Sequence, residues 1–383
     1  MSSEESTEPV PASRTQRLRE LAGLFLKLGL IGFGGPAAHL ALMEQECVRR
    51  RRWLSHEEFL DMVGATNLIP GPNSTELAIH IGRLRAGGAG LVVAGACFIL
   101  PAMLLVMGCG WLYVTYGQLP QVYALLYGVK PVIIAIVLQA LWNLGKSAVK
   151  SPGLALIGGV TVLGNLLGME ELVLLFGAAL VAMMGRRVSR SRLHAVVAMP
   201  LTPVAWGAAA PFGLWPMFLF FLKVGAVLFG SGYVLLAFLR ADLVERWHWL
   251  TDAQLFDAIA VGQVTPGPVF TTATFIGYIL GGVRGSLLAT LGIFLPAFVF
   301  VAISAPLLRR LRASPTMGAF LDGLNVASLA LMVVVTWQLG RSAVIDAVTV
   351  GIALVAAVLL LRFRVNSLWL VLGGALLGWA VKS

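Results

Sequence analysis

Leu68-Ile69-Pro70-Gly71-Pro72-Asn73-Ser74-Thr75-Glu76 interrupts an apolar run that covers residues 57–82. Proline removes a backbone donor and glycine permits positive φ, so the Pro-Gly-Pro unit cannot continue a helix. At membrane depth such a break is stable only where protein or a hydrated cavity satisfies the freed backbone groups. A second unit, Pro266-Gly267-Pro268, interrupts the apolar run 253–278. The two breaks predict a helical membrane protein with interrupted helices.

The composition agrees with a membrane protein. The 383 residues are 58% hydrophobic and 12% charged, well below the ~25% charged share of soluble domains. This excludes an ordinary soluble enzyme, a disordered chain and a disulfide scaffold. The formal charge is +10, but most cations fall in short loops between apolar runs, so we expect no nucleic-acid partner. The three cysteines form no CxxC and no histidine cluster accompanies them, so no metal or other cofactor is predicted.

The chain contains an internal duplication. Phe25-Leu26-Lys27-Leu28-Gly29 recurs as Phe221-Leu222-Lys223-Val224-Gly225, at an offset of 196 residues, and the two Pro-Gly-Pro units fall at the same offset. Lysines and Pro-Gly-Pro units in register are not chance matches between apolar letters. We therefore expect a polar N-terminal tail at 1–19, a first repeat at 20–185, a basic, proline-containing linker at 186–213 and a second repeat at 214–383.

The distribution of cations distinguishes two topologies. If both broken runs span, the chain crosses twelve times in parallel halves, with 14 Lys/Arg inside and 11 outside. If each broken run is a re-entrant hairpin, each half crosses five times and the halves are inverted, with 17 inside and 8 outside. The positive-inside rule favours the second arrangement. The expected fold is all-α and polytopic, with inverted-topology repeats, about ten spanning helices and two Pro-Gly-Pro hairpins; Leu21–Met43 and Trp215–Leu239 are two of the expected spans.

Small polar side chains flank both breaks. In the first repeat they are Asn67, Asn73, Ser74 and Thr75, and in the second they are Gln263, Thr265, Thr271 and Thr272. A helix that begins after each break directs free N–H groups and the positive end of its dipole towards whatever lies there. The sequence predicts an anion site built on Pro70, Gly71, Pro72, Pro266, Gly267 and Pro268. A hinge or a packing kink is the alternative, which two repeat-related breaks disfavour.

Lys27 and Lys223 lie within apolar runs. A cation there is costly unless it is paired, faces a cavity or snorkels to the interface. Each lies about two turns before a glycine-rich break, where backbone can approach a ligand closely; these breaks contain Gly34-Gly35 and Gly230-Ser231. We expect the lysines to balance the charge of a bound anion. Snorkelling and close helix–helix contacts are the alternatives.

Three carboxylates are candidates for ion coupling. Asp61 and Asp257 are repeat partners that either carry a proton or cap helix starts with arginine partners, and the structural role is slightly favoured. Glu76 follows the first break directly, and its repeat partner is Thr272. An unpaired carboxylate at such a place is a candidate carrier of a proton or a cation.

The motifs resemble the chromate ion transporter family. The resemblance rests on Gly32–Pro36, Arg52–Leu54 followed by Phe59 and Asp61, and Leu68–Pro72, with a second copy from Phe229 to Pro268, and it covers roughly residues 20–381. It implies a multi-pass carrier of the bacterial inner membrane that exports chromate, with sulfate as a related oxyanion. Alternating access, coupled to an ion gradient or to anion exchange, is the implied mechanism.

The expected partners are therefore the oxyanion, the lipid bilayer and a second copy of the chain in a dimer. A passive anion channel and a carrier of another oxyanion are the alternative functions. A membrane enzyme is disfavoured because the sequence has no HExxH, GxSxG or P-loop motif. The second repeat has Ser231-Gly232 where the first has Gly35-Pro36, so we expect the two halves of the site to differ.

Overall fold

The structure, a computed structural model, describes residues 13–33, 35–117, 119–188, 211–229, 234–304, 315–363 and 365–382, and these form helices and connecting turns without β-strands. Most of the expected tail and linker lies outside this part. Helix α1 begins at Arg14, several residues before the expected end of the polar tail, because Ser13 caps it: the Gln16 amide donates to Ser13 Oγ at 3.2 Å.

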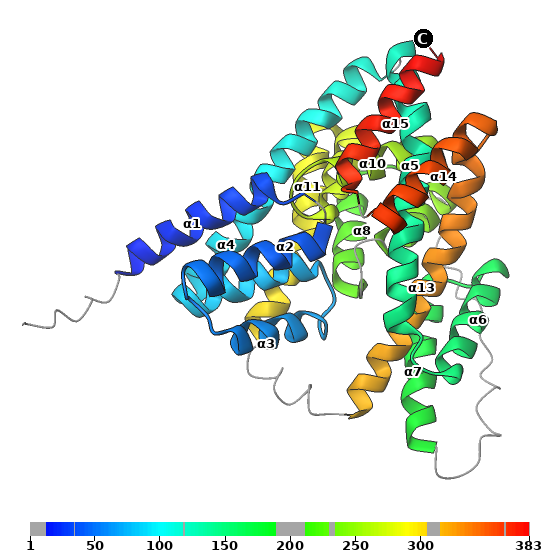
Figure 1. The fold of residues 1–383 in the computed structure, drawn as a ribbon. Coiled ribbons are helices and arrows are strands. Elements are labelled where there is room, and N and C mark those ends of the chain that lie inside the picture. The colour runs from blue at the N-terminus through cyan, green and yellow to red at the C-terminus, as the bar shows by residue number, and fades with distance from the viewer. Residues whose placement is uncertain are drawn as a thin grey trace, which may run out of the picture.

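The two repeats contain the same helices in the same order (Figure 1). The first repeat consists of α1 (Arg14–Ile31), α2 (Gly35–Met43) with the π-helix η1 (Glu44–Arg50), α3 (His56–Thr66), α4 (Asn73–Tyr116), α5 (Pro120–Ala148), α6 (Pro152–Leu166) and α7 (Glu171–Val188). The second consists of α8 (Leu214–Val227), α9 (Leu235–Phe238) with the π-helix η3 (Leu239–Arg246), α10 (Asp252–Val264), the 3-10 turn η4 (Val269–Thr271), α11 (Thr272–Ser304), α13 (Pro315–Ala343), α14 (Ala347–Phe363) and α15 (Ser367–Lys382).

The expected single spans Leu21–Met43 and Trp215–Leu239 are wrong, because both helices are broken. Helix α1 ends at Ile31, and α2 begins at Gly35, whose φ of 75° is open to glycine at little cost. The chain folds back there, which brings η1 against α1. In the second repeat α8 likewise ends at Val227 and the next helix begins at Leu235.

Helices α4 and α11 each contain a sharp reversal. The backbone leaves the helical region at Ala86–Gly87 and again at Gly281–Gly282, where the second glycine has φ of 63° and 59° respectively. A β-carbon on Gly82 would lie 2.3 Å from the Gly90 carbonyl oxygen, although eight residues of straight helix span about 12 Å. Each helix therefore has a short arm that lies against its own long arm.

The short arms complete two helical hairpins around the proline-rich breaks. Hairpin 1 consists of α3, the break at Pro70–Pro72 and the short arm of α4 (73–85), and hairpin 2 consists of α10, the break at Pro266–Pro268, η4 and the short arm of α11 (272–280). This is the helix–break–helix arrangement that the Pro-Gly-Pro units predict.

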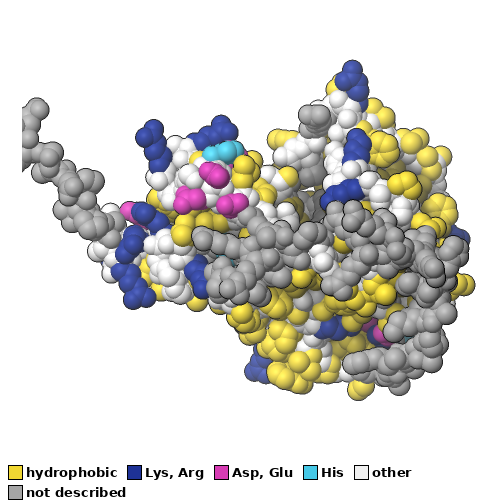
Figure 2. Space-filling view, turned by 90° about the horizontal axis from the view of Figure 1, so that it is seen from below, with side chains coloured by type: hydrophobic (Ala, Val, Ile, Leu, Met, Phe, Trp, Pro, Cys, Tyr) yellow, Lys and Arg dark blue, Asp and Glu magenta, His cyan; other side chains and the backbone are white. Residues whose placement is uncertain are grey.

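Four helices in the described part are long and apolar enough to cross a membrane: α4, α5, α11 with η4, and α13. Shorter apolar helices, including α6, α7, α8, α14 and α15, accompany them. Figure 2 shows hydrophobic side chains over much of the main bundle, whereas Lys and Arg side chains gather on the lobe of α1–α3 that projects to one side. An apolar outer surface of this kind is stable against lipid and not against water.

The repeats exchange their last two helices. Helices α6 and α7 of the first repeat pack on α13 of the second, and α14 and α15 pack on α5 of the first (Figure 1). Small residues bring the backbones together at both contacts: Gly128 on α5 meets Gly374 and Gly378 on α15, and Gly323 on α13 meets Ala178 on α7. The repeats are therefore interlocked and do not form two separate bodies.

The α5–α15 contact is tested by Gly378→Ala. A β-carbon there would lie 2.4 Å from the Ala124 carbonyl oxygen, so we expect a loss of about 1–3 kcal/mol and a lower Tm in detergent. Gly373→Ala on the same helix is the matched control, because its β-carbon meets nothing within 4 Å. Equal Tm values for the two variants would contradict this packing.

Candidate functional site

Two hydrogen bonds related by the repeat join the halves at the breaks. The Gly71 amide donates to the Leu228 carbonyl oxygen at 2.8 Å, and the Gly267 amide donates to the Gly32 carbonyl oxygen at 2.9 Å. The two acceptors lie just beyond the ends of α8 and α1, where carbonyl groups have no partner within the helix. The amides of Gly71 and Gly267, two residues of the predicted anion site, therefore bind protein carbonyl groups in this structure.

The breaks are also packed against the opposite repeat. A β-carbon on Gly267 would lie 2.5 Å from the β-carbon of Ala102 on the long arm of α4. One on Gly71 would lie 3.7 Å from that of Ala297 on the long arm of α11. Each Pro-Gly-Pro turn thus fits against the long helix of the other half, and protein satisfies much of the interrupted backbone.

A cavity of about 640 Å³ lies beside both breaks. Hairpin 1 contributes Asn67, Pro72, Asn73 and Ser74, hairpin 2 contributes Pro268, Val269 and Phe270, and the C-terminal end of α5 and the middle of α13 close the other sides. The first residues of α4 and of η4 therefore face one space. Of the predicted binding residues, Asn67, Pro72, Asn73, Ser74 and Pro268 line it.

Hydrogen-bond donors of the cavity wall remain available. The amides of Thr75 and Glu76 donate to the Pro72 carbonyl oxygen, whereas Asn73 and Ser74 are the first two residues of α4 and precede its first internal bonds. Ser328 of α13 also lines the cavity; its side chain is buried, and its hydroxyl has no hydrogen-bond partner within the described part of the chain. The wall is therefore suited to a ligand that accepts hydrogen bonds.

Sequence reasoning missed the α13 and α5 side of this cavity. Asn325, Ser328, Ser147 and the ion pair between Lys150 and Asp322, at 2.7 Å, all contribute to the lining. Polar residues within the apolar run of α13 could have indicated this side of the cavity. One of them, Asn325, occupies the position equivalent to Lys130 of the first repeat.

Several other predicted residues lie elsewhere. The hydroxyls of Thr265, Thr271 and Thr272 donate to the carbonyl oxygens of Val261, Pro268 and Val269 at 2.7–2.8 Å, and none of these threonines lines the cavity. Gln263 is also outside the lining, and Gly35 lies next to Pro36, which is part of it. Gly34, Gly230 and Ser231 lie outside the described residues.

Lys27 and Lys223 form equivalent ion pairs and do not line the cavity. Lys27 donates to Glu46 at 2.8 Å and Lys223 donates to Asp242 at 2.9 Å. Arg50 and Arg246 bind the same two acids, at 3.1 and 2.8 Å. Because the Lys27 hydrogen bond favours the charged carboxylate, the pKa of Glu46, which lies in η1 outside the four candidate spans, is below its ordinary value.

These acids were missed although Glu46 and Asp242 occupy equivalent repeat positions. The ion pairs connect α1 to η1 and α8 to η3, so they fix the fold-back after each broken first helix.

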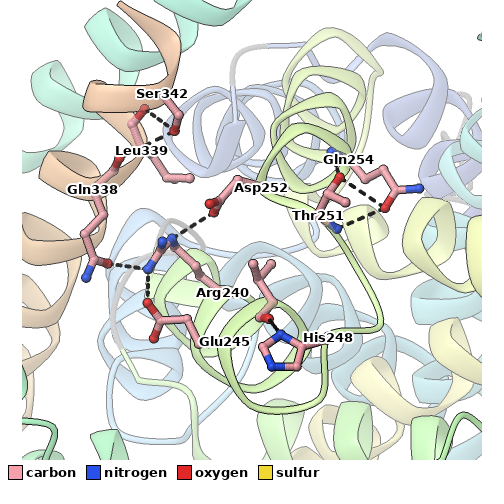
Figure 3. Close-up of polar contacts among 10 residues, drawn as sticks. Arg240, Glu245, His248, Thr251, Asp252, Gln254, Gln338, Leu339 and Ser342 are labelled. Carbon is pink, nitrogen blue, oxygen red and sulfur yellow. Dashed lines mark hydrogen bonds and ion pairs between the residues drawn. The ribbon is translucent and has the colours of Figure 1, made fainter.

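A charged cluster joins η3 to α10 and α13 of the second repeat and to the α6–α7 turn of the first. Arg240 of η3 donates to Asp252 at 3.0 Å and to Gln338 of α13 at 2.7 Å, and it also pairs with Glu245 (Figure 3). Arg246 reaches Glu170 in the α6–α7 turn at 2.5 Å. The first repeat has Glu44 in place of Arg240, and Glu44 pairs with Arg49 within η1 itself.

Asp257 of hairpin 2 is bound by the first repeat. Tyr113 of α4 donates to one Asp257 oxygen at 2.8 Å, and Lys130 of α5 lies 3.9 Å from the other. Hairpin 2 is thereby closed on α5, whereas the cavity separates the Asn67 end of hairpin 1 from Asn325 on α13. Hairpins 1 and 2 are equivalent in the two repeats, and so are α13 and α5. Hairpin 2 nevertheless contacts α5, whereas a cavity lies between hairpin 1 and α13.

Two interlocked repeats, long apolar helices and a polar cavity beside interrupted helices define a multi-pass membrane protein of the transporter class. The chain belongs to the chromate transporter family: the family described as "Chromate transporter" matches it twice, at residues 19–185 and 215–379.

Relatives are similar over nearly their full length. The chain is 34% identical to "Chromate transport protein" of Cupriavidus metallidurans, covering 96% of this chain and 94% of that protein. It is 32% identical to "Probable chromate transport protein" of Synechococcus elongatus, covering 89% of each. It is 31% identical to "Chromate transport protein" of Pseudomonas aeruginosa, covering 98% and 95%. No solved structure matches the chain.

The contact between the halves is tested by Gly267→Ala. The variant places a β-carbon at φ of 94° and against Ala102, so we expect a lower Tm than for the parent chain. Gly168→Ala in the α6–α7 turn carries the same backbone strain, with φ of 84°, but its β-carbon meets nothing within 4 Å. A Tm loss no larger for Gly267→Ala than for Gly168→Ala would contradict a packed contact between the halves.

Proposed function

We propose that this chain is a secondary transporter that exports chromate, and related oxyanions such as sulfate, across the bacterial inner membrane. The single observation that carries the proposal is the cavity beside the two breaks, lined by the N-terminus of α4 and by the Ser328 hydroxyl, which has no partner among the described residues. Names of relatives support chromate as the cargo.

Binding in this cavity uses neutral donors. A tetrahedral dianion presents four oxygens that accept hydrogen bonds, and the backbone amides of Asn73 and Ser74 and the hydroxyls of Ser74 and Ser328 offer donors around it. The Asn73 side-chain amide donates one N–H to Asn67 Oδ1 at 2.7 Å and has a second N–H to offer the anion. The positive end of the α4 dipole adds a favourable field of the kind found at phosphate sites. Lys27 and Lys223 serve the fold in this proposal and do not touch the ligand.

Alternating access follows from the difference between the hairpins. In this conformation Asp257 of hairpin 2 binds Tyr113 of α4 and Lys130 of α5. Hairpin 1 is separated from α13 by the cavity. In the opposite conformation hairpin 1 would contact α13, and hairpin 2 would move away from α5 and leave an equivalent cavity there. The repeats supply two similar end states for such a movement. Coupling to an ion gradient or to anion exchange supplies its direction.

Everted membrane vesicles test the function. We expect uptake of labelled chromate, with sulfate and molybdate as competitors, and accumulation above equilibrium when a gradient is imposed. Flux without uphill accumulation would support a passive channel, and preference for another oxyanion would change the assigned cargo. The absence of flux for all three oxyanions would contradict the proposal.

The cavity itself is tested by Asn73→Ala and Ser328→Ala. Each removes a hydrogen bond to an anion, worth about 1.5–3 kcal/mol, so the half-saturation concentration should rise about tenfold or more. Ser342→Ala on α13 is the matched control, because that hydroxyl donates to the Leu339 carbonyl oxygen at 3.1 Å and does not line the cavity. Unchanged half-saturation in both cavity variants would place the anion elsewhere.

A further inference from the structure

Helix α4 carries a fully buried carboxyl group, that of Glu76. Glu76 is 0% exposed, and neither of its side-chain oxygens has a hydrogen-bond partner among the described residues. An ionised carboxylate in such surroundings costs many kcal/mol, and the neutral acid costs far less. The geometry therefore points to a carboxylic acid that holds a proton in this conformation.

Cations on α4, α1 and α8 bind other groups. Arg83, on the same helix, donates to the carbonyl oxygens of Val301 and Ala302 on α11. Lys27 of α1 and Lys223 of α8 are engaged in the ion pairs described above. The other ionisable groups on the elements packed against α4 are Arg14, Arg17, Arg19 and Glu20 of α1, His39 of α2, His56, Glu57, Glu58 and Asp61 of α3, Asp252 and Asp257 of α10, and Tyr278 and Arg284 of α11; α4 itself also carries His80, Arg85, Cys97, Cys109, Tyr113 and Tyr116.

Glu76 lies against the turn that joins the halves. A β-carbon on Gly71 would lie 2.4 Å from Glu76 Oε1, so the carboxyl group packs directly on the glycine whose amide binds Leu228 of the second repeat. A negative charge at this place would demand water or a donor, and the turn would have to move to admit either. Loss of the proton is thus linked to the contact between the halves.

A histidine lies one helical turn further along the same face. His80 follows Glu76 by four residues, a spacing that brings β-carbons to about 5–6 Å on a helix. It is 8% exposed, and its Nε2 has no partner within the described part of the chain. Arg83 then lies near the end of the short arm. Glu76, His80 and Arg83 thus follow one another along the short arm of α4, from the buried acid towards the edge of hairpin 1.

The second repeat has no equivalent of this pair. Thr272 occupies the position of Glu76, and its hydroxyl donates to the Val269 carbonyl oxygen at 2.8 Å. The position of His80 is taken by an apolar residue, since Phe275 and Ile276 are the neighbours there. The acid and the histidine are therefore an addition to the first repeat and are not required by the shared scaffold.

We propose that Glu76 is the proton-binding site through which oxyanion movement is coupled to a proton gradient, and that His80 passes the proton between Glu76 and the edge of hairpin 1. The step moves one proton: Glu76 becomes a carboxylate as neutral His80 becomes an imidazolium, which then releases the proton to water. This inference rests on the proposed function, because it assigns the coupling ion of the same carrier.

The test uses the full chain in proteoliposomes. Chromate counterflow without a gradient measures carrier movement, and chromate accumulation under an imposed pH gradient measures coupling. We expect Glu76→Gln, which keeps size and packing, to retain counterflow and to lose gradient-driven accumulation down to the level seen without a gradient. Glu57→Gln is the matched control, because Glu57 is an exposed carboxylate on the same hairpin, and it should retain both activities.

The outcomes separate the two proposals. Absence of counterflow in the parent chain for every oxyanion would refute the proposed function, whereas full accumulation in Glu76→Gln would refute the coupling site alone. His80→Gln should slow gradient-driven accumulation severalfold while leaving counterflow intact, and unchanged accumulation would remove His80 from the path.

A spectroscopic readout is independent of transport. The purified parent chain should show an infrared C=O band of a protonated carboxyl group at neutral pH, and Glu76→Gln should lack it. Glu57→Gln should keep the band. A parent chain without this band, or a Glu76→Gln variant that retains it in full, would overturn the proposal even where a variant fails to transport.

Discussion

The centre of the molecule depends on two backbone hydrogen bonds, from Gly71 to Leu228 and from Gly267 to Gly32. Each satisfies a donor in a proline-rich turn and an acceptor beyond a helix end, groups that lipid cannot solvate. Because donor and acceptor come from different repeats, each of these two glycine amides depends on the other half of the molecule. The helix N-termini that line the cavity are held in place by these contacts, and so is the turn on which Glu76 packs.

Within this shared frame the polar residues differ between the halves. Asn325 and Lys130 occupy equivalent positions, but Asn325 lines the cavity and Lys130 pairs with Asp257. Glu76 has no acidic counterpart in the second repeat, and Arg240 occupies the position equivalent to Glu44. Hairpin 2 and η3 of the second repeat are consequently fastened to α5, α13 and the α6–α7 turn, and hairpin 1 of the first repeat leaves space for a ligand. A near-symmetric backbone with asymmetric side chains gives two similar conformations with different contacts.

The sequence was sufficient to predict the duplication, the helix–break–helix elements and the cavity residues from Asn67 to Ser74, because proline, glycine and polar residues in register have local consequences. It did not reveal the fold-back at Gly35, because a glycine-rich break within an apolar run fits a close helix contact as well as a turn. The reversal at Ala86–Gly87 follows the end of the apolar run 57–82 and lies beside Arg83 and Arg85, but its sharpness depends on contacts between the two arms of α4. The partners of Lys27 and Lys223 and the use of the Gly71 and Gly267 amides depend on long-range contacts. Pairing of terminal helices across the repeats is likewise invisible to periodicity, which shows that a face is buried but not against which helix.

The exchange of helix pairs has a consequence for biogenesis. Helix α5 is synthesised well before the helices that cover it, because α6 to α13 lie between α5 and the pair α14 and α15. Until then its glycine-lined face around Gly128 has no native neighbour. The nascent protein must therefore keep an unfinished surface protected in the bilayer until α14 and α15 have been synthesised.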